Sequence, residues 1–324
     1  MPPAPEPALE ALRSRLGEQH LGDPQLIELL LAALLAKGHV LIEGAPGLGK
    51  TRLLRALADA VALDFQRVQG TPDLMPGDLT GGEILDQVEG VGKFRFEAGP
   101  LFTQVCLFDE INRATPRTQA ALLEAMAEHQ VTVGGTTHAL PDPFLVAATQ
   151  NPIELEGTYP LPEAQLDRFL FHLQVQPPNA ATLVDIFRLE TRGDASAQGS
   201  AEALLDADQL RGLQAQAAAL PIADVFLEQL AAILRATDPQ DSSAPALVRE
   251  SVTWGASPRA GLATLAGARG LALLRGRAHV APDDLRDALY PALRHRVLLR
   301  YEAQAEGLDG DTIVRTVLEE HPLR

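Results

Sequence analysis

The sequence predicts an α/β fold followed by a helical domain, and three observations support this. Short apolar runs typical of strands alternate with helical periodicity as far as about residue 175, which indicates a parallel sheet covered by helices. The first of these runs leads through a glycine-rich turn into a helix. After Pro177-Pro178 the strand signals stop and only helical periodicity remains. With 324 residues, 46% of them hydrophobic, the chain can bury a full core, and its length suggests two domains.

The α/β part contains five candidate strands. They are residues 39–43, 64–69, 104–108, 144–150 and 169–174. Leu26–Ala36 reads as a core helix before the first strand, since it is too short to cross a bilayer that needs ~20 residues. The long excursion 70–101, between the second and third strands, contains two runs in which apolar and polar residues alternate. Segments of this length in a compact domain are usually functional or mobile, and the alternative is an enlarged surface loop. Gly134-Gly135 predicts a hairpin over His129–Leu140.

The helical part is predicted to contain six helices. They are residues 180–190, 207–219, 223–236, 258–275, 282–290 and 311–319. We therefore divide the chain into an N-terminal tip with a first helix (1–20), an α/β core (21–178) and a helical domain (179–324). Met1–Pro7 has no signal-peptide pattern and is expected to be a disordered tip, so we expect a cytoplasmic protein without membrane insertion.

The composition limits the possible partners. The net charge of −16 argues against a broad nucleic-acid surface, because such surfaces need clustered Lys and Arg, although a basic strip inside an assembled ring stays compatible with it. The single cysteine, Cys106, lies in an apolar run and is expected to be buried and unreactive.

A phosphate-binding loop follows the first strand. The run matches G-x-x-x-x-G-K-[ST] and consists of Gly44, Ala45, Pro46, Gly47, Leu48, Gly49, Lys50 and Thr51. Its backbone N–H groups and Lys50 suit phosphate oxygens, while the Thr51 hydroxyl suits Mg²⁺. With Arg52 in the same turn, and a helix N-terminus adding positive potential, these residues predict binding of a nucleotide triphosphate, which the resemblance described below implies to be ATP, with ADP as its product.

Two carboxylates follow the third strand. Asp109 and Glu110 lie where the carboxyl edge of a parallel sheet gathers ligands. Asp109 would hold Mg²⁺ together with Thr51, and Glu110 would act on the attacking water as a general base. A solvated acidic turn is the alternative for the pair taken alone.

Several runs resemble one family in order. They are Leu107–Ala114, Gln119–Met126, Ala148–Pro152, Leu161–Phe169 and Gly255–Ala260. Together with the phosphate-binding loop, they resemble the MoxR family of AAA+ ATPases from about residue 21 to residue 320. The resemblance implies a P-loop AAA+ core, with a parallel five-stranded sheet between helices and an insertion in the second helix at 70–101. It also implies a C-terminal all-α lid.

The resemblance also implies roles for individual residues. Asn151 corresponds to sensor 1, with a turn-forming Asn as the alternative. Arg168 corresponds to an arginine finger that acts on the neighbouring subunit's nucleotide, with a salt bridge to an adjacent carboxylate as the alternative. Arg259 corresponds to sensor 2, behind a helix cap at Ser257. Arg113 could reach a neighbouring site or form a surface salt bridge.

The family lines its adenine pocket at the place that Leu21-Gly22 occupies here, whereas Asp23-Pro24 departs from the family pattern. The implied function is Mg²⁺-dependent ATP hydrolysis by a homo-hexamer that remodels or matures an unidentified protein client. Its implied partner carries a von Willebrand factor A domain. The alternatives are a slow nucleotide-switched scaffold and a motor of the magnesium-chelatase or nucleic-acid type.

Overall fold

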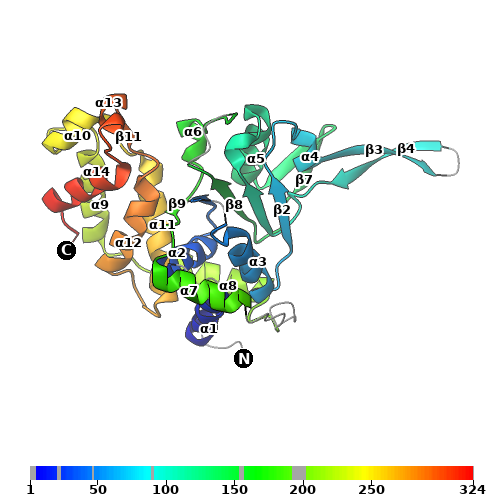
Figure 1. Ribbon diagram of the computed structural model, residues 1–324, viewed down its shortest axis with the longest axis horizontal. Coiled ribbons are helices and arrows are strands. Elements are labelled where there is room, and N and C mark those ends of the chain that lie inside the picture. Colours follow the sequence, from blue (N-terminus) through cyan, green and yellow to red (C-terminus); the bar gives the residue numbers. More distant parts are fainter. Residues whose placement is uncertain are drawn as a thin grey trace.

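The computed structural model describes residues 5–19, 23–45, 47–88, 91–152, 157–191 and 202–323 (Figure 1). Its centre is a five-stranded parallel sheet with the order β2-β5-β8-β1-β9. The strands are β1 (Val40–Glu43), β2 (Phe65–Gln69), β5 (Val105–Asp109), β8 (Leu145–Gln150) and β9 (Phe171–Gln174). All five were predicted from the sequence, and the α/β class is confirmed.

Each face of the sheet has its own hydrophobic core. Successive strand residues point to opposite faces, so Val105 and Leu107 of β5 join one cluster while Cys106 and Phe108 join the other. All four side chains are fully buried. Strands that are covered on both faces appear as continuous apolar runs, which is the pattern of this segment. Burial raises the pKa of the Cys106 thiol to about 12, as expected of an unreactive core residue.

Helices cover both faces of the sheet. They are α1 (Pro5–Gln19), α2 (Pro24–Leu35), α3 (Lys50–Ala60), α4 (Pro76–Thr80), the 3-10 helix η1 (Ile111–Arg113), α5 (Pro116–Glu128) and α6 (Glu163–Leu166). Helix α1 packs on α2 and α3. Because α1 begins at Pro5, the disordered tip predicted through Pro7 is too long, and residues 1–4 lie outside the described residues.

Local chemistry explains where α2 begins. The Asp23 Oδ1 atom accepts a hydrogen bond from the N–H of Gln25 at 2.8 Å, and Pro24 occupies the first turn. An Asp cap followed by Pro is a strong helix start. The departure of Asp23-Pro24 from the family pattern therefore has a structural role, because it starts a helix of which nine residues are buried.

Two β-hairpins leave the core. The excursion predicted at 70–101 folds as α4 followed by β3 (Gly81–Val88) and β4 (Val91–Ala98), paired from Gly81↔Ala98 onward. Figure 1 shows this hairpin projecting from the end of the molecule opposite the helical domain. The hairpin expected over His129–Leu140 forms from β6 (Gln130–Val133) and β7 (Thr136–Ala139). Its turn uses Gly134 and Gly135 at φ of 56° and 81°, which a two-residue turn requires.

The C-terminal part, which we call the lid, is predominantly helical. Its helices are α7 (Ala180–Thr191), α8 (Ala207–Ala219), α9 (Asp224–Ala236), α10 (Ala246–Ser251), α11 (Pro258–Leu274), α12 (Pro282–Leu293), α13 (Tyr301–Ala305) and α14 (Gly310–Glu320). The sequence did not predict α10, α13 or the short ribbon of β10 (Val252–Trp254) and β11 (Leu298–Leu299). Such brief elements contain too few residues for a periodic signal.

In the described ranges no single helix is long and apolar enough to span a membrane. Helices α8 and α9, which are bent against each other, are long and apolar enough only when they are taken together.

Helix α11 approaches the core closely because it is rich in glycine. A Cβ atom at Gly270 would lie 2.5 Å from the carbonyl oxygen of Ala32 in α2, and one at Gly267 would overlap the ring of Phe171 in β9. The lid and the core therefore share one hydrophobic cluster across this contact.

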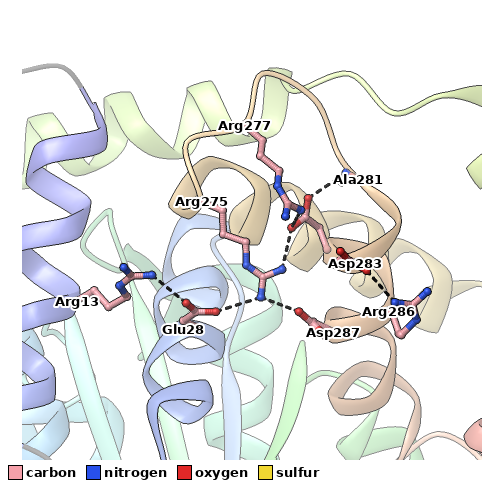
Figure 2. A network of polar contacts seen from close by, with 9 residues as sticks. Arg13, Glu28, Arg275, Arg277, Ala281, Asp283, Arg286 and Asp287 are labelled. Carbon is pink, nitrogen blue, oxygen red and sulfur yellow. Dashed lines mark hydrogen bonds and ion pairs between the residues drawn. The ribbon is translucent and has the colours of Figure 1, made fainter.

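A partly buried ionic network also joins the lid to α2 (Figure 2). At the end of α11, Arg275 donates to Glu28 of α2 at 3.1 Å and to Asp287 of α12 at 2.6 Å. It also donates at 2.9 Å to Asp284, which is fully buried. Arg13 of α1 contacts the other oxygen of Glu28 at 3.0 Å. Removing one partner from such a network leaves an uncompensated charge, so these helices are held as a unit.

Candidate functional site

The glycine-rich turn connects β1 to α3 as the sequence predicts. Gly47 and Gly49 have φ of 82° and 76°, a conformation that suits residues without a Cβ atom. Lys50 opens α3, and its Nζ donates to the Gly44 carbonyl oxygen at 2.6 Å. Burial lowers the pKa of this ammonium, while three nearby carboxylates act in the opposite direction. Pro46 lies outside the described residues.

The two predicted carboxylates stand at the end of β5. Glu110 adopts φ 56° and ψ 55°, a left-handed conformation that costs a residue with a side chain about 1–2 kcal/mol. The hydroxyl of Thr149 on β8 accepts from the Glu110 N–H at 2.9 Å and donates to Asp109 Oδ1 at 2.6 Å. A Cβ at Gly70 would overlap the Glu110 carbonyl. Strained backbone that neighbouring groups hold in place is typical of functional sites.

Two side chains of the edge strand β2 engage the same carboxylates. Arg67 donates to Asp109 Oδ2 from Nη2 at 2.6 Å and from Nε at 3.2 Å. Gln69 donates to Glu110 Oε2 at 2.7 Å. Strand β2 pairs with β5 so that Gln69 is opposite Asp109, which brings both side chains to the carboxyl edge. A cationic group therefore already lies against Asp109.

These groups face one cavity of about 440 Å³. It is lined by Gly47, Leu48, Gly49, Lys50, Thr51, Arg52, Arg67, Gln69, Asp109, Glu110, Thr149, Gln150 and Asn151. Asn151, which follows β8, is buried at 7% exposure. The parallel sheet thus brings the phosphate-binding loop, both carboxylates and Asn151 together, although they are up to about 100 residues apart in the chain. The geometry suits a triphosphate and an attacking water.

A second cavity, of about 300 Å³, lies between the core and the lid. Its lining includes Asp23 and Leu26 of α2, Gln174 at the end of β9, and Tyr290 and Arg294 of the lid. Gln174 pairs with Glu43, the residue before the phosphate-binding loop, so this cavity adjoins the start of that loop. Leu21 and Gly22, expected at the adenine, lie outside the described residues.

Comparisons with known proteins identify the family. A model of the ATPase family associated with various cellular activities matches residues 39–171, and a model of the AAA lid domain matches residues 244–317. The chain is 42% identical to Chaperone MoxR1 of Mycobacterium tuberculosis over 92% of its length and 78% of that protein. It is 32% identical to Protein MoxR of Methylorubrum extorquens over 93% of its length and 91% of that protein. The chain belongs to the MoxR family of AAA+ ATPases.

A solved structure of this fold supports the assignment. The crystal structure of a candidate ATPase from Cytophaga hutchinsonii, 33% identical, superimposes with a TM-score of 0.89 over 98% of this chain and 95% of the other. This MoxR-family chain is therefore an ATP-binding enzyme that hydrolyses ATP, with the AAA+ core and helical lid that its sequence predicts.

Three arginines that the resemblance assigns to the site do not reach the described residues of the phosphate-binding loop within one subunit. Arg168 is exposed and donates to the Leu123 carbonyl at 3.3 Å, and Arg259 contacts Asp167 at 3.4 Å. Within the described part of the chain, neither lines the 440 Å³ cavity. Arg113 pairs with Glu110 at 3.3 Å, which matches the salt-bridge alternative. Ser257 stands at the cap position of α11, but its hydroxyl makes no capping bond.

The donor set suits a magnesium ion. Thr51 offers a hydroxyl and Asp109 a carboxylate, and Mg²⁺ prefers oxygen ligands alongside water and substrate phosphates. The positively charged guanidinium of Arg67 lies against Asp109 Oδ2, at the place where a metal ion bound to this oxygen would lie.

The sequence did not identify Thr149, Arg67, Gln69 or the lid residue Tyr290 as site residues. Thr149 had a usable signal, since it lies two residues before Asn151 at the end of a predicted strand. Arg67 and Gln69 depend on which strand neighbours β5, and Tyr290 depends on how the lid docks. These are long-range facts that local patterns do not contain.

Proposed function

We propose that this MoxR-family ATPase works as a homo-hexameric ring that couples Mg²⁺-dependent ATP hydrolysis to the remodelling or maturation of a protein client. The observation that supports this proposal is that one subunit does not contain a complete catalytic site. One cavity gathers Lys50, Asp109, Glu110 and Asn151, whereas the exposed Arg168 lies outside it. A neighbouring subunit that supplied Arg168 would complete the site.

The residues of the cavity have separable roles in this proposal. Lys50 and the loop N–H groups bind the phosphates, and Arg52 lies in the same lining. Glu110 accepts a proton from the attacking water, and the Asn151 amide orients that water. Thr51 and Asp109 would hold Mg²⁺, which offsets phosphate charge when bound.

The remaining roles extend to the neighbouring subunit and to the lid. Arg168 would stabilise the charge that develops on the neighbour's nucleotide, an effect of about 10³–10⁵ in rate where it has been measured in other nucleotide hydrolases. Arg259 would report the state of the nucleotide in its own subunit. Arg113 would remain a contact of Glu110.

A chaperone-like role rests on relatives, since one similar protein is named Chaperone MoxR1. The proposed partner carries a von Willebrand factor A domain, and the proposed location is the cytoplasm. A second candidate is a slow nucleotide-switched scaffold. Gln69 and Arg113 both donate to Oε2 of Glu110, which favours the scaffold, because hydrogen bonds to a carboxylate make it a weaker base for the attacking water.

The test is the ATPase rate per subunit against protein concentration, with Mg²⁺ and with mass measured by light scattering. A rate that climbs as the protein assembles supports shared sites, and a flat rate in a monomer refutes them. Mixing is the sharper measurement. Arg168→Ala and Glu110→Gln subunits, each inactive alone, should regain activity together, because each supplies the half-site that the other lacks. A rate that stays very low with a partner present would favour the scaffold.

A further inference from the structure

The loop that carries Arg168 is held by the lid. Arg296, which follows α12, donates to the backbone carbonyls of Asp167, Phe169 and Leu170 at 2.9, 2.7 and 3.2 Å. Its side chain is only 5% exposed. The neighbouring His295 ring also lies 3.2 Å from the Phe169 carbonyl through Nε2. Lid atoms therefore fix the backbone on both sides of Arg168.

Hydrogen bonds occupy every donor of the Arg296 guanidinium. The same guanidinium donates to Asp167 Oδ1 at 2.7 Å and to the carbonyl of Ala292 in α12 at 2.6 Å. A guanidinium has five N–H donors, and five acceptors surround this one. Because the planar group is rigid and buried, a movement of α12 carries the 167–170 loop with it.

Asp167 has a second partner of a different kind. Its Oδ2 accepts from Arg259 of α11 at 3.4 Å, and the Arg259 side chain is 69% exposed. An exposed contact of this length contributes little and exchanges readily. The Asp167 carboxylate therefore has one fixed partner in Arg296 and one exchangeable partner in Arg259, and Arg168 is the next residue along the chain.

We propose that Asp167 is a positioning residue for Arg168, and that Arg259 and Arg296 pass the state of the lid in one subunit to the arginine offered to the next. When Arg259 leaves Asp167 for a nucleotide, the carboxylate keeps only its bond network with Arg296, and the loop follows α12. This inference rests on two proposed roles, the action of Arg168 in a neighbouring site and the contact of Arg259 with the nucleotide of its own subunit.

The experiment measures how well a subunit donates its arginine. Acceptor subunits carry Arg168→Ala, so they hydrolyse ATP only beside a donor. Donor subunits carry Glu110→Gln, so their own hydrolysis is absent and any further change acts through the neighbour. We would compare donors with Glu110→Gln alone and with added Asp167→Asn, Arg259→Ala or Asp208→Asn. Asp208 is an exposed matched control that pairs with Arg211 inside α8.

We expect the Asp167→Asn donor to lower the recovered kcat by about tenfold or more, since misplacing a group by about 1 Å can cost 10²-fold. The acceptor KM for ATP should stay within about twofold, because acceptor binding residues are unchanged. The Arg259→Ala donor should also lower the recovery, because without Arg259 the lid of the donor no longer responds to the donor's nucleotide. The Asp208→Asn donor should not lower it. Light scattering must show equal assembly, and Asp167→Glu replaces Asp167→Asn if that variant does not assemble.

The outcomes separate this inference from the proposed function. Full recovery with the Asp167→Asn donor overturns the positioning role while action in trans stands. Full recovery with the Arg259→Ala donor overturns the link to the lid. No recovery with the plain Glu110→Gln donor overturns action in trans, and the inference with it.

Discussion

Replacing Arg67 by methionine should strengthen Mg²⁺ binding. Arg67 donates twice to Asp109 Oδ2, at 2.6 and 3.2 Å, so its guanidinium occupies an oxygen that we propose as a metal ligand. A divalent cation must displace it to reach that oxygen. Methionine has a similar length, but it has neither the charge nor the donors. The substitution therefore removes the competitor and keeps most of the side-chain volume.

The size of the effect follows from the exposure of the pair. The Arg67 side chain is 46% exposed and that of Asp109 17% exposed. Exposed ion pairs contribute about 0.2–1 kcal/mol, and hydrogen bonds to charged groups about 1.5–3 kcal/mol when shielded. A half-exposed pair with two donors should contribute about 1 kcal/mol, which corresponds to about fivefold in a dissociation constant.

The assay is a titration of Mg²⁺ into protein with a fluorescent ADP analogue. We expect an apparent dissociation constant about fivefold lower for Arg67→Met, with a smaller difference at high salt, which screens charges. Arg95→Met is the matched control, because Arg95 on β4 is 58% exposed and pairs with Asp86 away from the cavity. An unchanged or higher constant for Arg67→Met would refute competition for the carboxylate.

Three further predictions concern the site and the core. Thr149→Val removes the hydrogen bonds to the Glu110 backbone N–H and to Asp109 Oδ1, so kcat should fall by about 10–100-fold while ADP titrations show unchanged binding. Gly270→Ala should lower the free energy of unfolding in denaturant by about 1–2 kcal/mol, because overlap with the Ala32 carbonyl outweighs the helix propensity gained. Burial lowers the pKa of His39 to about 4, so the unfolded chain binds this proton first. The contribution of His39 to the free energy of unfolding should therefore drop as the pH falls from about 6.5 to about 4, by about 3 kcal/mol at most, and His39→Gln should remove this part of the pH dependence.

The sequence predicts those parts of the fold that depend on patterns among neighbouring residues. The strand, glycine turn and helix around Gly44–Thr51 follow from a local motif, and the β6–β7 turn follows from Gly134-Gly135. The five core strands were recognisable because burial on both faces makes each an apolar run. The ribbon β10–β11 was not, since its two strands are short and lie more than 40 residues apart in the chain.

The residues of the site likewise fall into those that local patterns predict and those that depend on long-range contacts. Lys50, Asp109, Glu110 and Asn151 each follow a strand, and a parallel sheet brings such residues to one edge. The contact of Arg67 with Asp109 depends on the register between β2 and β5, which periodicity does not specify. Contacts of the lid with the core depend on docking, so the sequence did not indicate that Asp167 accepts from Arg296.

Helix α12 lies between the 300 Å³ cavity and the loop that carries Arg168. Asp287 and Tyr290 on α12 line the 300 Å³ cavity beside β9, and we propose that this cavity receives the base of the nucleotide. Asp287 is also anchored to α2 through Arg275 (Figure 2). The residues that follow α12 include Arg296, which holds the loop of Arg168. A base that displaced α12 would therefore displace that loop too, because Arg296 donates both to the Ala292 carbonyl of α12 and to the carbonyls of the loop. Occupancy of one subunit's cavity would in this way set the position of the arginine offered to the next.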